Sequence, residues 1–159
     1  MQPTLIIAEA GVNHNGNISL AKELVVAAAE AGADFVKFQT FKAEKIVSKK
    51  AQQASYQIKN AGDSGGQFEM LKKLELDIDS HHLLIEEAEK QGIKFLSTAF
   101  DLESIELLDK LDLGLWKIPS GEITNRPYLE SIGKRKDPII MSTGMSNLKE
   151  IEDALNILY

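Results

Sequence analysis

Short apolar runs alternate along the chain with segments whose apolar residues recur at helical spacing. Five of these runs are rich in β-branched and aromatic residues and end at polar or turn residues, which favours strands. Strands that alternate with helices are typical of βα units and of a parallel sheet. The pattern therefore predicts an α/β protein. The predicted strands are residues 5–8, 35–39, 94–98, 115–118 and 139–142.

Capping signals mark the helices between these strands. Gly32 and Gly92 follow the first two predicted helices, and glycine commonly ends helices. Asp101 can cap the start of the third helix, and Asn147 with Glu150 three residues later forms a variant of the capping box for a fourth. The first three helices are expected at residues 19–31, 80–91 and 102 to about 111.

A long connection, about residues 41–79, separates the second strand from the next long helix. Connections of this length in compact domains are more often binding loops or lids than plain linkers. It carries a glycine-rich turn cluster at residues 60–66 and a run of lysines that is expected to be a solvated face. These lysines are Lys42, Lys45, Lys49 and Lys50.

Two lysines interrupt apolar strands where a buried parallel strand favours Val or Ile. They are Lys37 and Lys117. Burying an unpaired ammonium costs several kcal/mol, so an anion is expected beside each lysine. A structural carboxylate is the commoner explanation for one such lysine. The equivalent position of both lysines in their strands favours a bound phosphate or carboxylate.

Each predicted strand also ends in polar residues. The carboxyl ends of parallel strands form the ligand-binding rim of α/β proteins, so these polar side chains are expected to gather there. Helix capping or turn formation is the alternative role for any single hydroxyl. The polar side chains of this rim are Glu9, Lys37, Gln39, Ser97, Thr98, Lys117, Ser120, Glu122, Ser142 and Thr143.

Composition narrows the partners and the location. The net charge of -6, with acidic residues scattered along the chain, argues against nucleic acid and anionic membranes. The absence of cysteine excludes disulfides and thiolate zinc sites. The chain starts without the basic region of a signal peptide, and no apolar stretch approaches membrane-spanning length, so a cytoplasmic protein is expected.

Five motifs in order along the chain resemble the signatures of the sialic acid synthase family. The resemblance is strongest to the branches that make N-acetylneuraminate and legionaminate, and the sequence does not separate these two. It implies a parallel (β/α) barrel of the TIM type, of which about five βα units are present. The motifs are residues 7–16, 36–40, 95–100, 117–122 and 141–145.

The resemblance implies a transferase that condenses phosphoenolpyruvate with an N-acetylated hexose, similar to N-acetylmannosamine. The product would be a nonulosonic, sialic-acid-type acid, and phosphate would be released. Glu9 and Glu122 would be the catalytic carboxylates. Alternatively, Glu9 forms a closed ion pair with Lys37 or Lys117, and Glu122 caps a helix. By matching position, phosphoenolpyruvate would be bound by Lys37, Gln39, Thr98, Lys117, Ser120 and Ser142.

The family also uses a divalent metal, Mn²⁺ or Mg²⁺, whose histidine ligands come from later strands, and no metal ligand is expected within residues 1–159. A complete eight-unit barrel needs about 250 residues. The remaining strands and the family's C-terminal antifreeze-like domain are therefore expected to be absent, and a homodimer is expected for the complete enzyme. His14 is interpreted as a loop hydrogen-bonder, and His81 and His82 as surface residues.

Three alternatives stay open. Five βα units also make a doubly wound, flavodoxin-like sheet, although no Gly-x-Gly-x-x-Gly motif follows the first strand. The chain can instead be a catalytically inert, phosphate-binding half-barrel that works through self-association or a partner. The third alternative is a related enzyme that condenses phosphoenolpyruvate with a phosphorylated aldose, with the lysine-rich connection as its second phosphate site.

Overall fold

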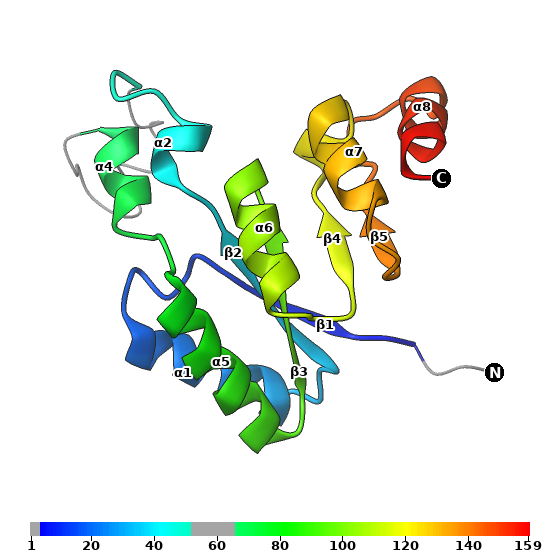
Figure 1. The fold of residues 1–159 in the computed structure, drawn as a ribbon. Helices are drawn as coiled ribbons and strands as arrows, with labels where there is room; N and C mark the ends of the chain where they lie inside the picture. Colours follow the sequence, from blue (N-terminus) through cyan, green and yellow to red (C-terminus); the bar gives the residue numbers. More distant parts are fainter. Residues whose placement is uncertain (1–3, 52–65) are drawn as a thin grey trace.

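The computed structural model describes residues 4–51 and 66–159, in which parallel strands alternate with helices (Figure 1). This confirms the predicted α/β class. Each predicted strand is found, with bounds that differ by one to three residues. The strands are β1 (Ile7–Gly11), β2 (Phe35–Thr40), β3 (Lys94–Ala99), β4 (Trp116–Ile118) and β5 (Ile139–Met141).

The capping signals identify the main helices correctly. Gly92 is left-handed at the end of α5, Asp101 caps α6, and Asn147 forms the complete capping box of α8 with Glu150. The helix α7 was not predicted, although Asn125 caps it. The helices are α1 (Ile18–Glu30), α2 (Ala43–Ile46), α4 (Gln67–Lys72), α5 (Ile78–Gln91), α6 (Leu102–Lys110), α7 (Arg126–Gly133), α8 (Leu148–Leu158) and the 3₁₀ turn η1 (Ser120–Glu122).

The strands form two hydrogen-bonded groups in the order of the sequence. One group is β1-β2-β3 and the other is β4-β5. In the flavodoxin-like arrangement the first strand lies between the second and the third. Here β2 lies between β1 and β3, so the flavodoxin-like alternative is wrong. Within the described residues β3 and β4 lie side by side without a ladder, which leaves a seam between the two groups.

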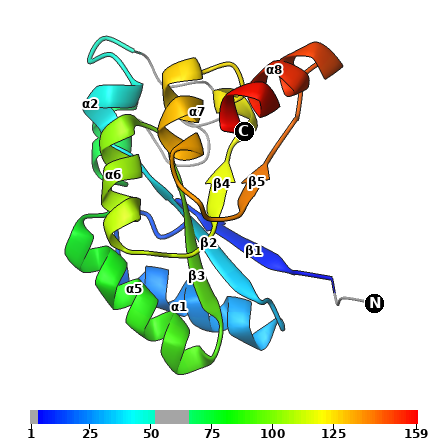
Figure 2. The same cartoon turned by 45° about the vertical axis from the view of Figure 1, so that its right-hand side comes forward.

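Each strand group has its own hydrophobic core. Helices α1 and α5 pack side by side on the outer face of β1–β3 (Figure 1). Val25, Phe38 and Leu84 are fully buried in this first core. The second core contains residues of β4, α6, α7 and α8, among them Ile118 and Leu129. Helices α7 and α8 pack against each other (Figure 2). Each core leaves the opposite face of its strands free for polar residues.

The start of β1 differs from the prediction of residues 5–8. Leu5 and Ile6 are about half exposed, and the pairing with β2 begins only at Ile7. The ladder then shifts register between Glu9 and Gly11, where Gly11 has a φ of +54°. A Cβ atom at Gly11 would lie 3.2 Å from Glu9 Oε1, so the glycine allows the Glu9 side chain to pack over this irregularity.

Tyr128 connects the two groups across the seam. This fully buried tyrosine of α7 donates a hydrogen bond of 2.8 Å from its hydroxyl to the carbonyl oxygen of Ala99, at the end of β3. Burial is the main cause that raises the pKa of its phenol, so the hydroxyl stays protonated and remains a donor.

Replacing Tyr128 by phenylalanine should lower the free energy of unfolding by about 1–3 kcal/mol, because the buried Ala99 carbonyl loses its side-chain partner. Urea denaturation followed by circular dichroism measures this change. Tyr159, the last residue of the sequence, is fully exposed. Tyr159→Phe is therefore the matched control that should leave the stability unchanged. Equal stability of the two variants would contradict a role of the Tyr128 hydroxyl at the seam.

Candidate anion-binding site

The strands present one row of polar side chains on the face opposite the cores. Val36 and Phe38 of β2 pack into the core under α1 and α5. Because side chains alternate along a strand, Lys37 and Gln39 point to the opposite, inner face. The parallel register places Glu9 beside Lys37 and Gln39 beside Thr98. Four of the predicted site residues therefore share the inner face of β1–β3.

Lys37 is in the middle of this row. Its ammonium forms an ion pair with Glu9 and lies 3.4 Å from the hydroxyl oxygen of Thr98. The Lys37 side chain is only 13% exposed, whereas that of Glu9 is 50% exposed. The ion pair predicted as the alternative role of Glu9 is therefore present, and the exposed carboxylate remains open to solvent.

Lys117 has different partners on β4 and β5. Its Nζ donates hydrogen bonds of 2.7 Å to the Ser142 hydroxyl and to the backbone carbonyl of Ile118. Burial, followed by the nearby charge of Lys37, lowers the pKa of the Lys117 ammonium, and the charge of Glu9 opposes this effect. The two lysines and Glu9 thus interact across the seam.

The balance of charge in this cluster favours an incoming anion. Two ammonium groups lie near a single carboxylate, and no carboxylate of the described residues forms an ion pair with Lys117. Repulsion between two partly desolvated cations falls when a phosphate or carboxylate group binds between them. The inner face can therefore bind a small anion through Lys37, Lys117 and the hydroxyls of Thr98 and Ser142.

Two predicted residues lie to the side of this cluster. Ser120 lies in η1 and shares a surface hollow with Gly144, in the loop after β5. Glu122 ends the same turn and accepts a hydrogen bond of 2.6 Å from the side-chain amide of Asn125, the N-cap of α7. Among the described residues no hydrogen bond or ion pair joins Glu122 to the lysines. The cap of α7 is Asn125 itself, so Glu122 does not cap this helix but contacts the residue that does.

The histidines differ from the prediction at one position. His82 is exposed, as predicted, but His81 is fully buried, so its assignment to the surface is wrong. Helix α5 buries His81, Leu84 and Ala88, which are spaced at i, i+3 and i+7. This spacing is the signal in the sequence that places His81 on the buried side of the helix. Its Nε2 lies 2.8 Å from the Thr40 hydroxyl.

His14 is a loop hydrogen-bonder, as predicted. Its Nδ1 accepts a hydrogen bond of 3.1 Å from the backbone of Gly16, and the ring is fully buried beside Phe38. The Nε2 atom has no hydrogen-bond partner within the described part of the chain. Burial lowers the pKa of His14, which favours the neutral ring.

Acidification should destabilise the protein through these two buried histidines. Burial lowers the pKa of His14 and His81 below the ordinary 6.5, so the unfolded chain takes up protons that the folded state does not. Stability present above pH 6.5 is therefore lost as the pH falls, by up to about 1.4 kcal/mol per pH unit for each group. Urea titrations between about pH 7 and pH 5.5 measure this slope. His81→Gln should reduce it and exposed His82→Gln should not; equal slopes would contradict the argument.

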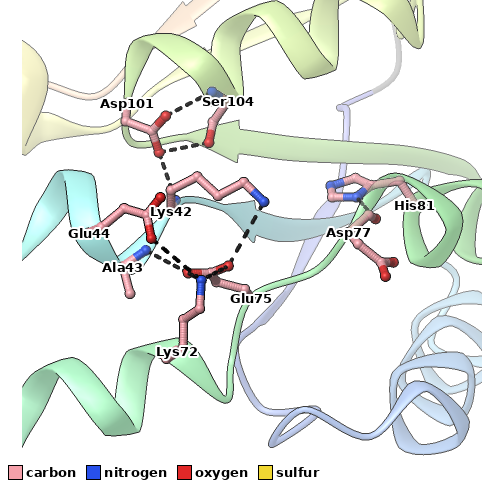
Figure 3. A network of polar contacts seen from close by, with 9 residues as sticks. All are labelled: Lys42, Ala43, Glu44, Lys72, Glu75, Asp77, His81, Asp101 and Ser104. Carbon is pink, nitrogen blue, oxygen red and sulfur yellow. Dashed lines mark hydrogen bonds and ion pairs between the residues drawn. The ribbon is translucent and has the colours of Figure 1, made fainter.

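The connection after β2 is anchored by a polar network that the sequence analysis missed (Figure 3). Glu75 accepts a hydrogen bond of 2.8 Å from the backbone of Ala43 and pairs with Lys72 at 3.0 Å. Asp101 caps α6 and also accepts a hydrogen bond of 2.8 Å from the backbone N–H of Lys42. These bonds fix α2 at the carboxyl end of β2. The turn cluster at residues 60–66 lies outside the described residues, apart from Gly66.

The lysines of this connection are largely occupied. Lys42 lies 3.9 Å from Glu75, and Lys45 pairs with Glu103 at 2.6 Å. Lys49 and Lys50 are exposed, as expected of a solvated face. The ion pairs of Lys42 and Lys45 weaken the case for a second phosphate site at this connection.

No described helix is long and apolar enough to cross a membrane. The residues at positions 4–51 and 66–159 also contain no group of three or more histidine, aspartate or glutamate side chains that fits a metal ion. Glu9, the acidic group nearest the lysines, is already paired with Lys37.

Parallel strands in sequence order, with polar and basic side chains at one rim, are typical of barrel-type α/β proteins, whose ligand sites lie at the carboxyl ends of the strands. Comparison with known proteins gives the family. The model of the NeuB family matches residues 24–159, so the chain belongs to the NeuB family, and the family resemblance seen in the sequence is confirmed.

Relatives with known names support this assignment. The chain is 59% identical over 158 residues to the N,N'-diacetyllegionaminic acid synthase of Campylobacter jejuni. This match covers 99% of the chain and 47% of the relative. The chain is also 56% identical over 151 residues to the enzyme of the same name from Legionella pneumophila. That match covers 95% of the chain and 42% of the relative.

A solved structure agrees with the fold. The N-acetylneuraminic acid synthetase of Leptospira borgpetersenii, solved in complex with citrate, superposes with a TM-score of 0.82 at 30% identity. The match covers 99% of this chain and 50% of that one. The chain thus spans about half the length of the relatives it matches.

Proposed function

We propose that the chain is the phosphoenolpyruvate-binding part of a synthase that condenses phosphoenolpyruvate with an N-acetylated hexose similar to N-acetylmannosamine. The product is a nonulosonic acid of the sialic or legionaminic type, and phosphate is released. Two synthases named for N,N'-diacetyllegionaminic acid support this proposal, at 59% and 56% identity. These identities favour the legionaminate branch.

The observation that carries the proposal is the pair of lysines on the inner face. Lys117 is partly desolvated, has a lowered pKa, and forms no ion pair with a carboxylate of the described chain. Phosphoenolpyruvate carries a phosphate and a carboxylate on three carbons, so it can neutralise both ammonium groups. Hydrogen bonds between charged groups contribute about 1.5–3 kcal/mol each.

The chemistry assigns a role to each predicted binding residue. Lys37 and Lys117 bind the anionic groups, while Gln39, Thr98 and Ser142 orient them, and Ser120 assists from the side of the cluster. Carbon 3 of phosphoenolpyruvate forms a bond to the aldehyde carbon of the sugar, whose oxygen takes a proton. Water adds to carbon 2, and phosphate leaves as its C–O bond breaks. Glu9 is exposed beside Lys37 and is the candidate group for proton transfer.

The structure gives Glu122 less support as a second catalytic carboxylate. Its contact with Asn125 holds it at the start of α7. Glu9 is the stronger candidate of the two predicted carboxylates.

The proposal includes the architecture of the complete enzyme. Strand order and the match to the Leptospira structure support a TIM-type barrel of which residues 1–159 form a truncated part of about five βα units. The described residues do not fit a divalent metal, so no step is assigned to one. A requirement for Mn²⁺ or Mg²⁺, held by residues outside this chain, the C-terminal antifreeze-like domain, the homodimer and the cytoplasmic location stay predictions.

Isothermal titration calorimetry of the purified chain with phosphoenolpyruvate tests the proposal. We expect saturable binding that weakens when salt is added, because the contacts are charged. Pyruvate, which lacks the phosphate, is the matched control ligand and should bind more weakly. Equal affinity for the two ligands, or no binding of phosphoenolpyruvate, would contradict the proposed site.

The second function left open by the sequence is that of a catalytically inert, phosphate-binding half-barrel. It would act only in association with itself or a partner. The two functions differ in product formation. Protein of this length that binds phosphoenolpyruvate but makes no nonulosonic acid with a divalent metal and an N-acetylated hexose would favour the second one.

A further inference from the structure

A series of buried hydrogen bonds lies between α5 and the strands β2 and β3, on the face opposite the anion site. The Ser97 hydroxyl oxygen lies 2.6 Å from that of Thr40, which lies 2.8 Å from Nε2 of His81. The Nδ1 atom of His81 lies 2.7 Å from the backbone carbonyl oxygen of Asp77 (Figure 3). Ser97, Thr40 and His81 are all at most 2% exposed, so water does not compete for these bonds.

The chemistry of the groups fixes the direction of these bonds. A carbonyl oxygen only accepts, so Nδ1 of His81 carries the proton that is donated to Asp77. In the neutral ring Nε2 is then an acceptor, and it receives the hydroxyl hydrogen of Thr40. The Thr40 oxygen in turn accepts the hydroxyl hydrogen of Ser97. The four groups form one consistent series of bonds, with each donor matched to an acceptor.

The series joins two strands to one helix at the level of the proposed site. Thr40 follows Gln39 on β2, and Ser97 precedes Thr98 on β3. Because side chains alternate, Gln39 and Thr98 point to the inner face while their neighbours point to α5. Gln39 and Thr98 are direct partners in the parallel register. A shift of β2 against β3 would therefore move both inner side chains.

His81 is held firmly from the side of α5. The Asp77 carboxylate caps this helix by accepting the backbone N–H of Ser80 at 2.8 Å, and the His81 ring packs edge-on against Phe95 at 5.9 Å. His81 lies in the first turn of α5, so its ring connects the start of this helix to the carboxyl ends of β2 and β3.

We propose that His81 is a positioning residue for the anion site, which acts through Thr40 and Ser97 to fix Gln39 and Thr98. It does not touch the anion. Thr98 is in turn a neighbour of the Lys37 ammonium, so the register of β2 and β3 sets the distance between them. The proposal rests on the proposed function for its binding readout, and on the fold alone for a second, ligand-free readout.

Two substitutions separate positioning from simple stability. Asparagine at position 81 can place its amide where Nδ1 lies and keep the bond to Asp77, but it is too short to reach Thr40. Glutamine can place its amide oxygen where Nε2 lies and accept from Thr40, but it loses the bond to Asp77. Each variant loses one buried hydrogen bond, so His81→Asn and His81→Gln should have similar melting temperatures.

Calorimetry with phosphoenolpyruvate gives the first readout. We expect His81→Asn to weaken binding by about fivefold to tenfold, and His81→Gln by less than about twofold. Thr40→Val, which removes the central hydroxyl and keeps the branched shape, should match His81→Asn, and the double variant should be no weaker than either single variant. His82→Asn, an exposed histidine in the same turn, is the control. Equal affinities of His81→Asn and His81→Gln would overturn the proposal.

Amide hydrogen exchange without ligand gives the second readout. The amides of Gln39 and Thr98 should exchange about tenfold faster in His81→Asn than in His81→Gln, while the amide of Ile118 on β4 should be unchanged. If the wild-type chain fails to bind phosphoenolpyruvate, the proposed function is wrong, but this comparison still decides the role of His81. Equal exchange at Gln39 and Thr98 in the two variants would overturn the positioning role.

Discussion

Replacing Lys117 by methionine should weaken the binding of phosphoenolpyruvate by about 2–5 kcal/mol, because a partly desolvated charge pair between ligand and protein is lost. Methionine has a similar volume and no charge, so the variant should fold at least as stably as the wild type. Lys117 donates hydrogen bonds to two groups that would lose this partner. The Ser142 hydroxyl lies at the partly exposed rim of β5, and the Ile118 carbonyl lies at the end of β4.

Calorimetry of Lys117→Met against wild type measures this loss, and exposed Lys136→Met, in the loop before β5, is the control that should bind normally. The affinity of the wild type should also fall as the pH rises through the lowered pKa of Lys117, below the ordinary 10.5, because only the protonated amine attracts the anion. Unchanged affinity in Lys117→Met would remove this residue from the site.

Replacing Glu9 by glutamine should slow turnover of the complete synthase by about 10²–10⁴-fold, the usual contribution of a group that transfers protons. Binding of phosphoenolpyruvate should be as tight as in the wild type or tighter, because the substitution removes the carboxylate that competes with the ligand for Lys37. The separate effects on turnover and affinity distinguish a catalytic Glu9 from a structural one.

Steady-state kinetics and calorimetry of Glu9→Gln together make this test, and Glu106→Gln, on the exposed side of α6, is the matched control. A normal rate with tighter binding would return Glu9 to the role of a closed ion-pair partner. The melting temperature should fall as well, because the substitution leaves the Lys37 ammonium, whose side chain is only 13% exposed, without its carboxylate partner.

The lysines were the most predictable part of the site. Lys37 and Lys117 interrupt strongly apolar strands, and the cost of burying a lone charge requires a partner whatever the fold. The sequence could not decide which partner, because the ion pair of Lys37 with Glu9 depends on the register of β1 against β2, in which these two residues lie side by side. Local sequence does not encode such a register, which is set by the pairing of β1 with β2.

The missed features have physical reasons of the same kind. His81 was assigned to the surface together with His82, because adjacent residues of a helix cannot share a face. Its spacing to Leu84 and Ala88 nevertheless places it on the buried side. Helix α7 has only eight residues and follows η1, so its Asn125 cap gave a weak signal on its own. Glu75 and Asp101 act through the backbones of distant residues, and no periodic pattern records such contacts.

The seam between β3 and β4 divides the proposed site. Glu9, Lys37 and Thr98 belong to the strands with the first core, whereas Lys117 and Ser142 belong to those with the second. Proteins open locally in cooperative units of this size. A ligand that contacts both lysines would act as a cross-link between the units. Substrate would then bind only when both units are closed, and its binding would convert two separate opening events into one.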